Sequence, residues 1–313
     1  MTSTLPKTSY YLGLGLGLGA VSTASIFIRY AQADGAPSLV IAAWRLTLAS
    51  LALLPVVLWR YSDQLRALTP RAWGLTLVSG IFLGLHFATW ISSLAYTTVA
   101  SSVVIVSSSP LFVALISAGL LREWPTRPVR LGLAVALAGI VTIGLADLCT
   151  PHGCPAPADL FRGRAFLGNL LALAGAIAVA VYFSIGRALR TEHAGRPSMT
   201  LIPYIFLTYG FASLTLIGSV LAMRLPAGGY APRAWLWFVL LALIPQLLGH
   251  SSYNWALKYL PATYVSVAAL GEPIGSTLLA VILLGEIPAP LKIVGGALIL
   301  AGIFIASQRA QAP

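Results

Sequence analysis

Long apolar runs, separated by short stretches rich in Pro, Gly and charged residues, occupy almost the whole chain. A helix that crosses the ~30 Å hydrocarbon core of a bilayer needs about 20 mostly apolar residues, and each run has about this length. Inside hydrocarbon, backbone N–H and C=O groups must be paired within the segment, so such runs are expected to be helical. The pattern predicts an all-α membrane protein with ten transmembrane helices, near residues 10–30, 37–59, 72–96, 98–121, 129–147, 165–189, 200–223, 234–257, 261–284 and 289–307.

The composition agrees with a surface that faces lipid. Hydrophobic residues make up 58% of the 313 residues and charged residues 9%, with a mean hydropathy of +0.89. A soluble chain carries charge at roughly a quarter of its positions. The net charge of +11 comes from basic residues scattered singly or in small groups between the apolar runs. That distribution is typical of topology determinants, and it argues against a nucleic-acid partner.

The distribution of Lys and Arg predicts the orientation in the membrane. With the N-terminus inside, twelve of these residues lie on the cytoplasmic side and six on the opposite side. Cytoplasmic loops carry the excess of Lys and Arg, so we expect a multi-pass protein of a bacterial inner (plasma) membrane with both termini in the cytoplasm. The loop 148–164 then lies outside, where Cys149 and Cys154 either form a disulfide or remain free thiols.

The two halves of the chain repeat each other. A shift of 163 residues aligns them without a gap over about forty residues, and it pairs Pro110 with Pro273, Glu123 with Glu286, Gly132 with Gly295, and Gly139 with Gly302. Each half, 1–147 and 165–313, contains five predicted spans, and an odd number inverts the second half. The sequence therefore predicts two five-helix inverted repeats around a central cavity, an architecture that supplies two alternative packings for alternating access.

Two sequence blocks resemble the paired signature of the drug/metabolite transporter superfamily, in its EamA branch. They are Pro110-Leu111-Phe112 with Leu120-Leu121-Arg122-Glu123, and Glu272-Pro273-Ile274 with Leu283-Leu284-Gly285-Glu286. Arg122 departs from the pattern, since the second half has the more typical Gly285. The resemblance implies ten helices, a central cavity, and export of amino acids, other metabolites or drugs. Within the superfamily, the chain is most similar to the bacterial aromatic amino-acid exporters.

Polar side chains in the middle of the predicted spans are the candidates for substrate contact. A charge at the bilayer centre costs at least about 2.5–3.5 kcal/mol, so such groups are expected to face the bundle interior or water. Helical spacing puts some of them on shared faces, where aromatic rings can hold apolar or cationic parts and polar groups can orient the rest. The alternative for each histidine is a buried, hydrogen-bonded structural role. The predicted substrate-binding residues are His86, Trp90, Gln246, His250, Tyr253 and Asn254.

A second set of residues is predicted to act in gating or in the fold. Arg45 either holds a substrate carboxylate or pairs inside the protein. Glu272 is either a hinge residue or a protonation site, and Ser109 either satisfies a kink or lines the cavity. The glutamates at the span ends either form gate contacts or cap the next helix. The full set is Arg45, Ser109, Pro110, Glu123, Glu272, Pro273 and Glu286.

The sequence contains no Gly-x-x-x-x-Gly-Lys-Ser/Thr loop that would bind nucleotide phosphates. We therefore expect a secondary transporter that exports amino acids, aromatic ones included, or related small metabolites. One alternative is a drug or nucleotide-sugar carrier on the same fold. Another is an integral-membrane enzyme acting on a lipid-linked substrate, although the four histidines are scattered. No catalytic residue, metal site or cofactor is expected, and the expected partners are a small-molecule substrate and the lipid bilayer.

Overall fold

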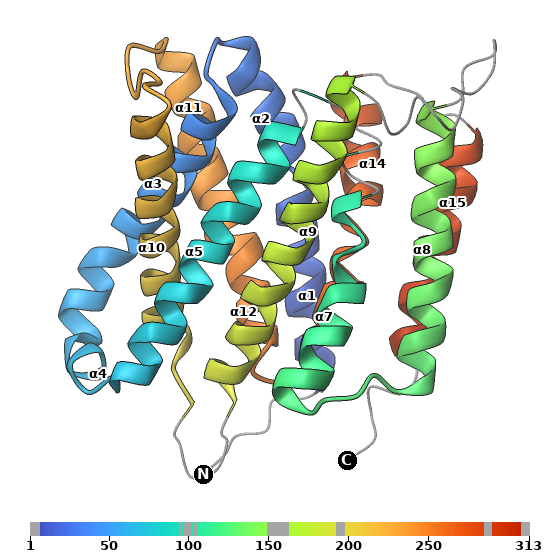
Figure 1. Cartoon of the computed structure of the whole chain (residues 1–313), viewed down its shortest axis with the longest axis horizontal. Coiled ribbons are helices and arrows are strands. Elements are labelled where there is room, and N and C mark those ends of the chain that lie inside the picture. The colour runs from blue at the N-terminus through green and yellow to red at the C-terminus, as the bar shows by residue number, and fades with distance from the viewer. Residues whose placement is uncertain are drawn as a thin grey trace.

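The computed structural model describes residues 7–93, 96, 102, 105–148, 163–191, 198–284 and 290–307. Within these residues the chain is a bundle of helices without a strand, so the predicted all-α class is confirmed (Figure 1). The first half holds α1 (Lys7–Ser22), α2 (Ala24–Ala33), α3 (Ser38–Arg60), α4 (Ser62–Arg66), α5 (Pro70–Ser93), α7 (Ser109–Ile116), the π-helix η1 (Ser117–Leu121) and α8 (Arg127–Leu148).

The second half has a similar order of elements. It holds α9 (Gly163–Arg190), α10 (Leu201–Ala222), α11 (Pro232–Leu241), the π-helix η3 (Ala242–His250), α12 (Ser251–Ala256), α13 (Ala262–Ala269), α14 (Glu272–Leu284) and α15 (Pro290–Ser307). The loop with Cys149 and Cys154 lies outside the described residues, and so does Glu286.

Several helices are long and apolar enough to cross a membrane. In the described part of the chain there are seven, at Ser9–Ala33, Ser38–Arg60, Pro70–Ser93, Phe166–Arg190, Leu201–Ala222, Pro232–Ala256 and Ala262–Leu283. Each coincides with a predicted span. The other predicted spans, 98–121, 129–147 and 289–307, include residues or side chains outside the described part, so the count of ten stays a prediction.

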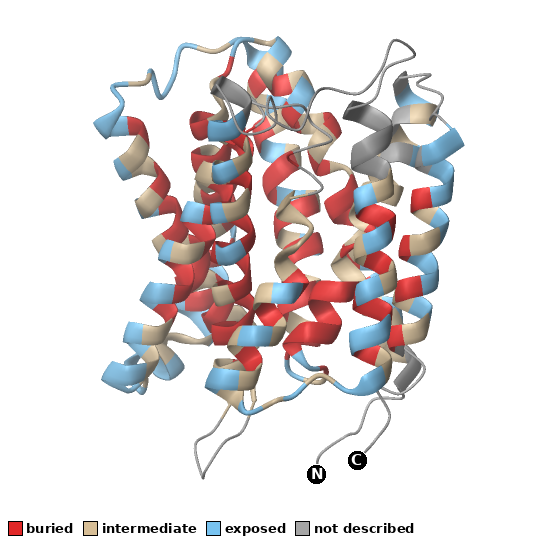
Figure 2. Cartoon of the chain, turned by 45° about the vertical axis from the view of Figure 1, so that its right-hand side comes forward, coloured by how far each residue is buried: buried red, intermediate tan, exposed pale blue. Residues whose placement is uncertain are grey.

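The outer surface of the bundle is apolar, as a lipid-facing surface requires. Figure 2 shows the buried residues gathered between the helices and the exposed ones on the outer faces. Large apolar side chains point outward along several helices, among them Leu16, Leu115, Leu221, Ile282 and Phe304. The protein is therefore a multi-pass membrane protein, with large apolar side chains on its outer faces and a set of polar side chains in its interior.

Two helices begin inside the bundle at positions related by the internal repeat. α7 begins at Ser109 with Pro110 in its first turn, and α14 begins at Glu272 followed by Pro273. The two starting points are 163 residues apart, which is the offset of the repeat. Proline fits the first turn of a helix because the N–H it lacks would have no partner there. The repeated Pro therefore marks a helix start in each half.

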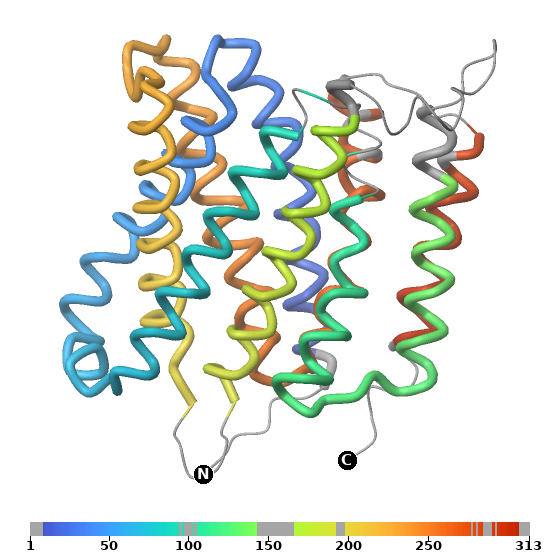
Figure 3. Tube along the Cα trace, viewed as in Figure 1, coloured from blue at the N-terminus to red at the C-terminus, as the bar shows by residue number. Residues whose placement is uncertain are grey.

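Helices α8 and α15, one from each half, pack closely against each other and run side by side in Figure 3. A Cβ atom added at Gly302 would lie 2.5 Å from the Gly132 carbonyl oxygen, and one added at Gly139 would lie 2.5 Å from the Gly295 oxygen. The early residue of one helix thus meets the late residue of the other, so the pair is antiparallel. The repeat pairs Gly132 with Gly295 and Gly139 with Gly302, whereas the contacts join Gly132 to Gly302 and Gly139 to Gly295.

We expect Gly139→Leu to destabilise the protein, because the added side chain must push α15 away from α8. Overpacking of this kind costs about 1–3 kcal/mol. The measurement is the thermal unfolding midpoint of the purified protein in detergent. Gly218→Leu is the matched control, since a Cβ at Gly218 meets nothing within 4 Å. Equal midpoints for the two variants would contradict the close-contact interpretation.

Candidate binding cavity

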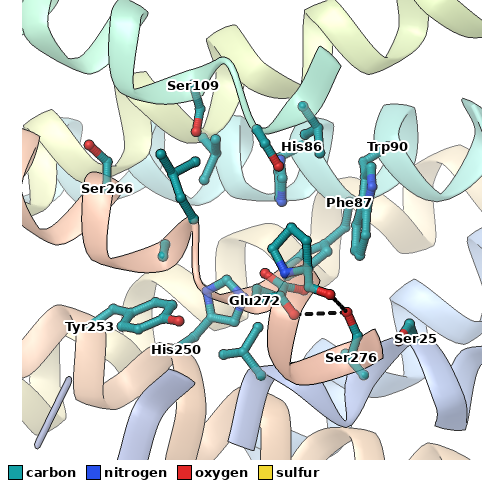
Figure 4. Close-up of a pocket in the computed structure, with 18 of the residues that line it drawn as sticks. Ser25, His86, Phe87, Trp90, Ser109, His250, Tyr253, Ser266, Glu272 and Ser276 are labelled. Atoms are coloured by element: carbon teal, nitrogen blue, oxygen red, sulfur yellow. Dashed lines mark hydrogen bonds between the residues drawn. The ribbon is translucent and has the colours of Figure 1, made fainter. Parts of the chain in front are cut away.

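A cavity lies inside the bundle, between helices of both halves (Figure 4). The space inside it that is open to the centre of a water-sized probe is about 110 Å³. The first half contributes residues of α1–α3, α5 and α7, and the second half contributes residues of α9 and of η3 to α14. Its polar and aromatic lining residues are Ser25, Arg45, His86, Phe87, Trp90, Ser107, Ser109, Phe183, His250, Tyr253, Ser266, Glu272 and Ser276.

Aromatic and imidazole rings form one continuous part of the wall. The His86 ring stacks on Trp90 with centroids 5.8 Å apart and planes 10° apart. His250 meets Phe87 edge-on at 5.4 Å and Tyr253 at 6.0 Å. The structure thus brings four of the predicted substrate-binding residues, His86, Trp90, His250 and Tyr253, to the same cavity.

One hydrogen bond fixes the orientation and the tautomer of the His86 ring. Its Nδ1 lies 3.0 Å from the carbonyl oxygen of Gly175 on α9. A carbonyl only accepts, so Nδ1 carries the hydrogen, and in the neutral ring Nε2 is left as an acceptor. Gly175 allows the approach, because a Cβ there would lie 3.2 Å from Thr89 Oγ1. The contact of α5 with α9 therefore orients the imidazole.

The structure places Gln246 and Asn254 behind the cavity wall, where they support it. Gln246 Oε1 accepts a hydrogen bond from Arg45 Nε at 2.8 Å. Asn254 Nδ2 donates to the His250 carbonyl at 2.9 Å and also to the Tyr182 hydroxyl. Neither amide is among the residues that line the cavity.

The predicted polar stripe is divided between the cavity and the protein behind its wall. Residues Ala242–His250 form a π-helix that contains Pro245, so the regular α-helical hydrogen-bond pattern is interrupted there. Within this segment His250 lines the cavity, whereas Gln246 bonds to Arg45 behind the wall.

Arg45 lies deep in the bundle and contributes directly to the wall. Its side chain is 1% exposed, and the guanidinium carbon lies 4.4 Å from the centroid of the Phe87 ring. Nε is held by Gln246, while Nη1 and Nη2 have no hydrogen-bond partner.

Unpartnered polar atoms gather around this cavity. Besides the two Arg45 nitrogens, Trp90 Nε1, His250 Nδ1 and the Tyr253 hydroxyl are buried without a partner. All of these residues line the cavity. A buried polar group without a partner costs about 1–3 kcal/mol, and more when it is charged. These are five of the eleven unpartnered buried side-chain atoms in the described residues, and their place around one cavity indicates a site that a polar ligand or water completes.

The other predicted gating and structural residues fall into two groups. Ser109, Glu272 and Pro273 line the cavity, whereas Pro110 is buried beside it in the first turn of α7. Ser276, which the sequence did not single out, also lines the cavity and donates to the Glu272 carbonyl oxygen at 2.8 Å.

Glu123 is far from the cavity, at the end of the bundle where α9 ends. Its Oε1 pairs with Arg187 Nε at 3.0 Å, and Arg187 Nη1 donates to the carbonyls of Leu257 at 2.8 Å and Lys258 at 3.2 Å. This cluster ties the segment after η1 to α9 and to the connection between α12 and α13. Of the two alternatives for Glu123, the structure contains the contact with a basic residue.

Sequence reasoning also missed several cavity residues. Phe87 and Phe183 belong to uniformly apolar runs, in which nothing separates a cavity-facing ring from a packed one. Ser25 follows Ser22-Thr23-Ala24, and Ser266 lies between two valines. The only available signal was position, because Phe87 follows His86 and Ser266 precedes the break at Leu270–Gly271.

Known proteins resemble this chain over its whole length. The profile of the EamA-like transporter family matches residues 9–145 and again residues 166–308. An uncharacterized transporter of Archaeoglobus fulgidus is 26% identical over 91% of this chain and 92% of its own length. The uncharacterized transporter YetK of Bacillus subtilis is 22% identical over 97% of this chain and 88% of its own length.

A third relative has a more specific name. A probable terminal-alkyne amino-acid exporter of Streptantibioticus cattleyicolor is 25% identical over 66% of this chain and 63% of its own length. A crystal structure of a protein 22% identical in sequence superposes with a TM-score of 0.75, over 98% of this chain and 99% of the other. This last likeness extends the agreement to the fold. With both halves matched by the family profile, the chain belongs to the EamA-like transporter family, in the drug/metabolite transporter superfamily.

Proposed function

We propose that this protein is a secondary transporter that exports amino acids, aromatic ones included, or related small metabolites across a bacterial inner membrane. The observation that carries the proposal is the cluster of buried, unpartnered polar atoms around an aromatic cavity in the bundle. Aromatic faces bind an apolar or aromatic substrate side chain, and the free donors bind its polar groups. The family is one of transporters, and one relative is named a probable amino-acid exporter.

The charge of the cavity favours this substrate class over a nucleotide sugar. The described wall contains one arginine, Arg45, and one carboxylate, Glu272. A diphosphate group would be held best by several cationic or donor groups, as in other phosphate sites. A wall with one charge of each sign suits a substrate that is neutral overall.

We infer that the two halves are inverted repeats of five helices each, with ten transmembrane helices in total. The crosswise glycine contacts of the antiparallel pair α8 and α15 support this, since an axis in the membrane plane would exchange them. So does the start of α7 and α14 at equivalent positions. The beginning of α1 and the end of α15 lie at the same end of the bundle (Figure 1), which fits an even number of spans with both termini in the cytoplasm.

The Glu123–Arg187 cluster is proposed to close the cytoplasmic end of the cavity. It joins three segments from both halves at the end of the bundle where α1 begins and α15 ends (Figure 1). Exposure of the cavity to that side requires these segments to separate. Glu286, the repeat partner of Glu123, is proposed to make the equivalent contact at the opposite end when that end is closed.

Transport is tested with the purified full-length chain in proteoliposomes loaded with radiolabelled phenylalanine. We expect efflux that is absent from protein-free liposomes and that is inhibited by tryptophan and tyrosine. A panel of sugars, nucleotide sugars and dyes is tested in parallel. Movement of one of these, with no movement of any amino acid, would refute the proposed substrate class.

Removing one aromatic wall should impair transport without unfolding the protein. For Trp90→Ala we expect efflux of phenylalanine to fall about tenfold, the equivalent of ~1.4 kcal/mol, because the substrate side chain loses its stacking surface. Trp59→Ala is the matched control, since Trp59 is 85% exposed on the outer face. Equal loss in both variants, or wild-type efflux in Trp90→Ala, would contradict the cavity assignment.

Breaking the cytoplasmic cluster should open that end of the cavity. In a chain with Cys149 and Cys154 replaced by Ser, Ser109→Cys places a thiol on the cavity wall. We expect Arg187→Gln to speed its labelling from the cytoplasmic side by an impermeant maleimide about tenfold or more. The charge-reversed pair Glu123→Lys with Arg187→Glu should restore part of the protection. Labelling that is unchanged by Arg187→Gln argues against a gate at this cluster.

A further inference from the structure

Arg45 presents a fixed guanidinium to the cavity. Gln246 Oε1 holds Nε at 2.8 Å, and the Phe87 ring lies under the guanidinium carbon at 4.4 Å. These contacts set both the direction and the plane of the group. Nη1 and Nη2 remain buried without a partner, and Arg45 is one of the residues that line the cavity.

The two free nitrogens are those that form a fork at the end of the side chain. The planar guanidinium binds a carboxylate through two parallel N–H···O bonds, a geometry that an ammonium group cannot reproduce. Nε is bonded to Gln246, and the Phe87 ring covers one face of the guanidinium. The hydrogen-bond donors that remain free on Arg45 are therefore those of Nη1 and Nη2. A carboxylate that meets this end of the side chain would satisfy both nitrogens at once.

A carboxylate of the protein lines the same cavity but forms no salt bridge with Arg45. Glu272 begins α14, immediately after the helix break at Leu270–Gly271, and Figure 4 shows it among the lining residues. Arg45 and Glu272 form no ion pair in the described part of the chain, although both line one cavity. One positive and one negative group are therefore separated within a single binding volume.

We propose that the cavity recognises the zwitterionic backbone of an α-amino acid, with Arg45 binding the carboxylate and Glu272 binding the ammonium group. The inference rests on the proposed amino-acid transport and specifies how the substrate is read. The substrate side chain then lies against the rings of the wall, chiefly Phe87, Trp90 and Tyr253. Because the wall pairs with both charges of the ligand, a compound that lacks either charge leaves one protein charge buried and unpaired.

The first experiment uses the wild-type chain and measures competition for binding of radiolabelled phenylalanine to the purified protein. The reference competitor is unlabelled phenylalanine. Phenylalaninamide and phenethylamine lack the carboxylate, and 3-phenylpropionate lacks the ammonium group. We expect each analogue to bind at least tenfold more weakly than phenylalanine. Analogues that compete as well as phenylalanine would overturn the inference.

Variants then assign each charge to its residue. Arg45→Lys keeps the charge but loses the fork, and it should weaken phenylalanine binding about tenfold while leaving phenethylamine unaffected. Glu272→Gln should weaken phenylalanine binding while leaving 3-phenylpropionate unaffected or tighter. A wild-type preference for phenylalanine over phenylalaninamide that survives Arg45→Lys and Arg45→Gln in full would overturn the role of Arg45.

The folding of each variant is checked by size-exclusion profile and thermal midpoint. If Arg45→Gln does not fold, the analogue series in the wild-type chain and in Arg45→Lys decides the question. The two proposals fail in different ways. Binding of a sugar, dye or nucleotide in place of any amino acid refutes the proposed function, whereas equal binding of amino acids and of the analogues that lack one charge refutes only the zwitterion site.

Discussion

A polar group in the middle of a bilayer must find its partner inside the protein or in a ligand, because lipid offers none. This constraint explains where regular helix is kept and where it is lost. The outer faces of the described helices carry apolar side chains, while the break at Leu270–Gly271 and the π-helix Ala242–His250 lie next to the cavity. Irregular backbone is tolerated at that depth only where it is buried in protein or lines a cavity.

The same constraint separates two kinds of buried polar atom. Asn254 Nδ2, the Tyr182 hydroxyl and Gln246 Oε1 bond to other protein groups and hold neighbouring helices in place. The outer nitrogens of Arg45 and the polar atoms of Trp90 and His250 have no such partners. The first kind stabilises the bundle whether or not a substrate is present. The second kind costs free energy in the empty protein, which substrate binding can recover.

Much of the fold follows from the sequence because it rests on local properties. The length of each apolar run predicts a span, and the offset between Pro110 and Pro273 predicts a kink at equivalent positions of the two halves, where the structure has the starts of α7 and α14. His86 and His250 could be picked out because ionisable groups at mid-span are costly on a lipid-facing surface, and Trp90 and Tyr253 because helical spacing puts each on the same face as a histidine. The partners could not be predicted. Arg45 meets Gln246 across 201 positions, and no periodicity encodes that contact.

The main departure from the expected site lies in the π-helix Ala242–His250. Gln246 and His250 are four residues apart in it, yet Gln246 bonds to Arg45 while His250 lines the cavity. Pro245 indicates a disturbance in the helix, yet the side chain that the disturbance redirects depends on packing against α3.

The glycine contacts between α8 and α15 have a consequence for how such a chain can evolve. Gly132 and Gly139 face Gly302 and Gly295, the counterparts of Gly139 and Gly132 in the second repeat. Each copy of the repeat thus supplies the space that the other copy needs. Two duplicated halves can diverge in substrate contacts, loops and surface. A methyl group gained at this crossing in one half, however, would clash with the backbone of the other half. Divergence at this point is therefore shared, and the crossing should preserve the record of the duplication after the rest of the chain has lost it.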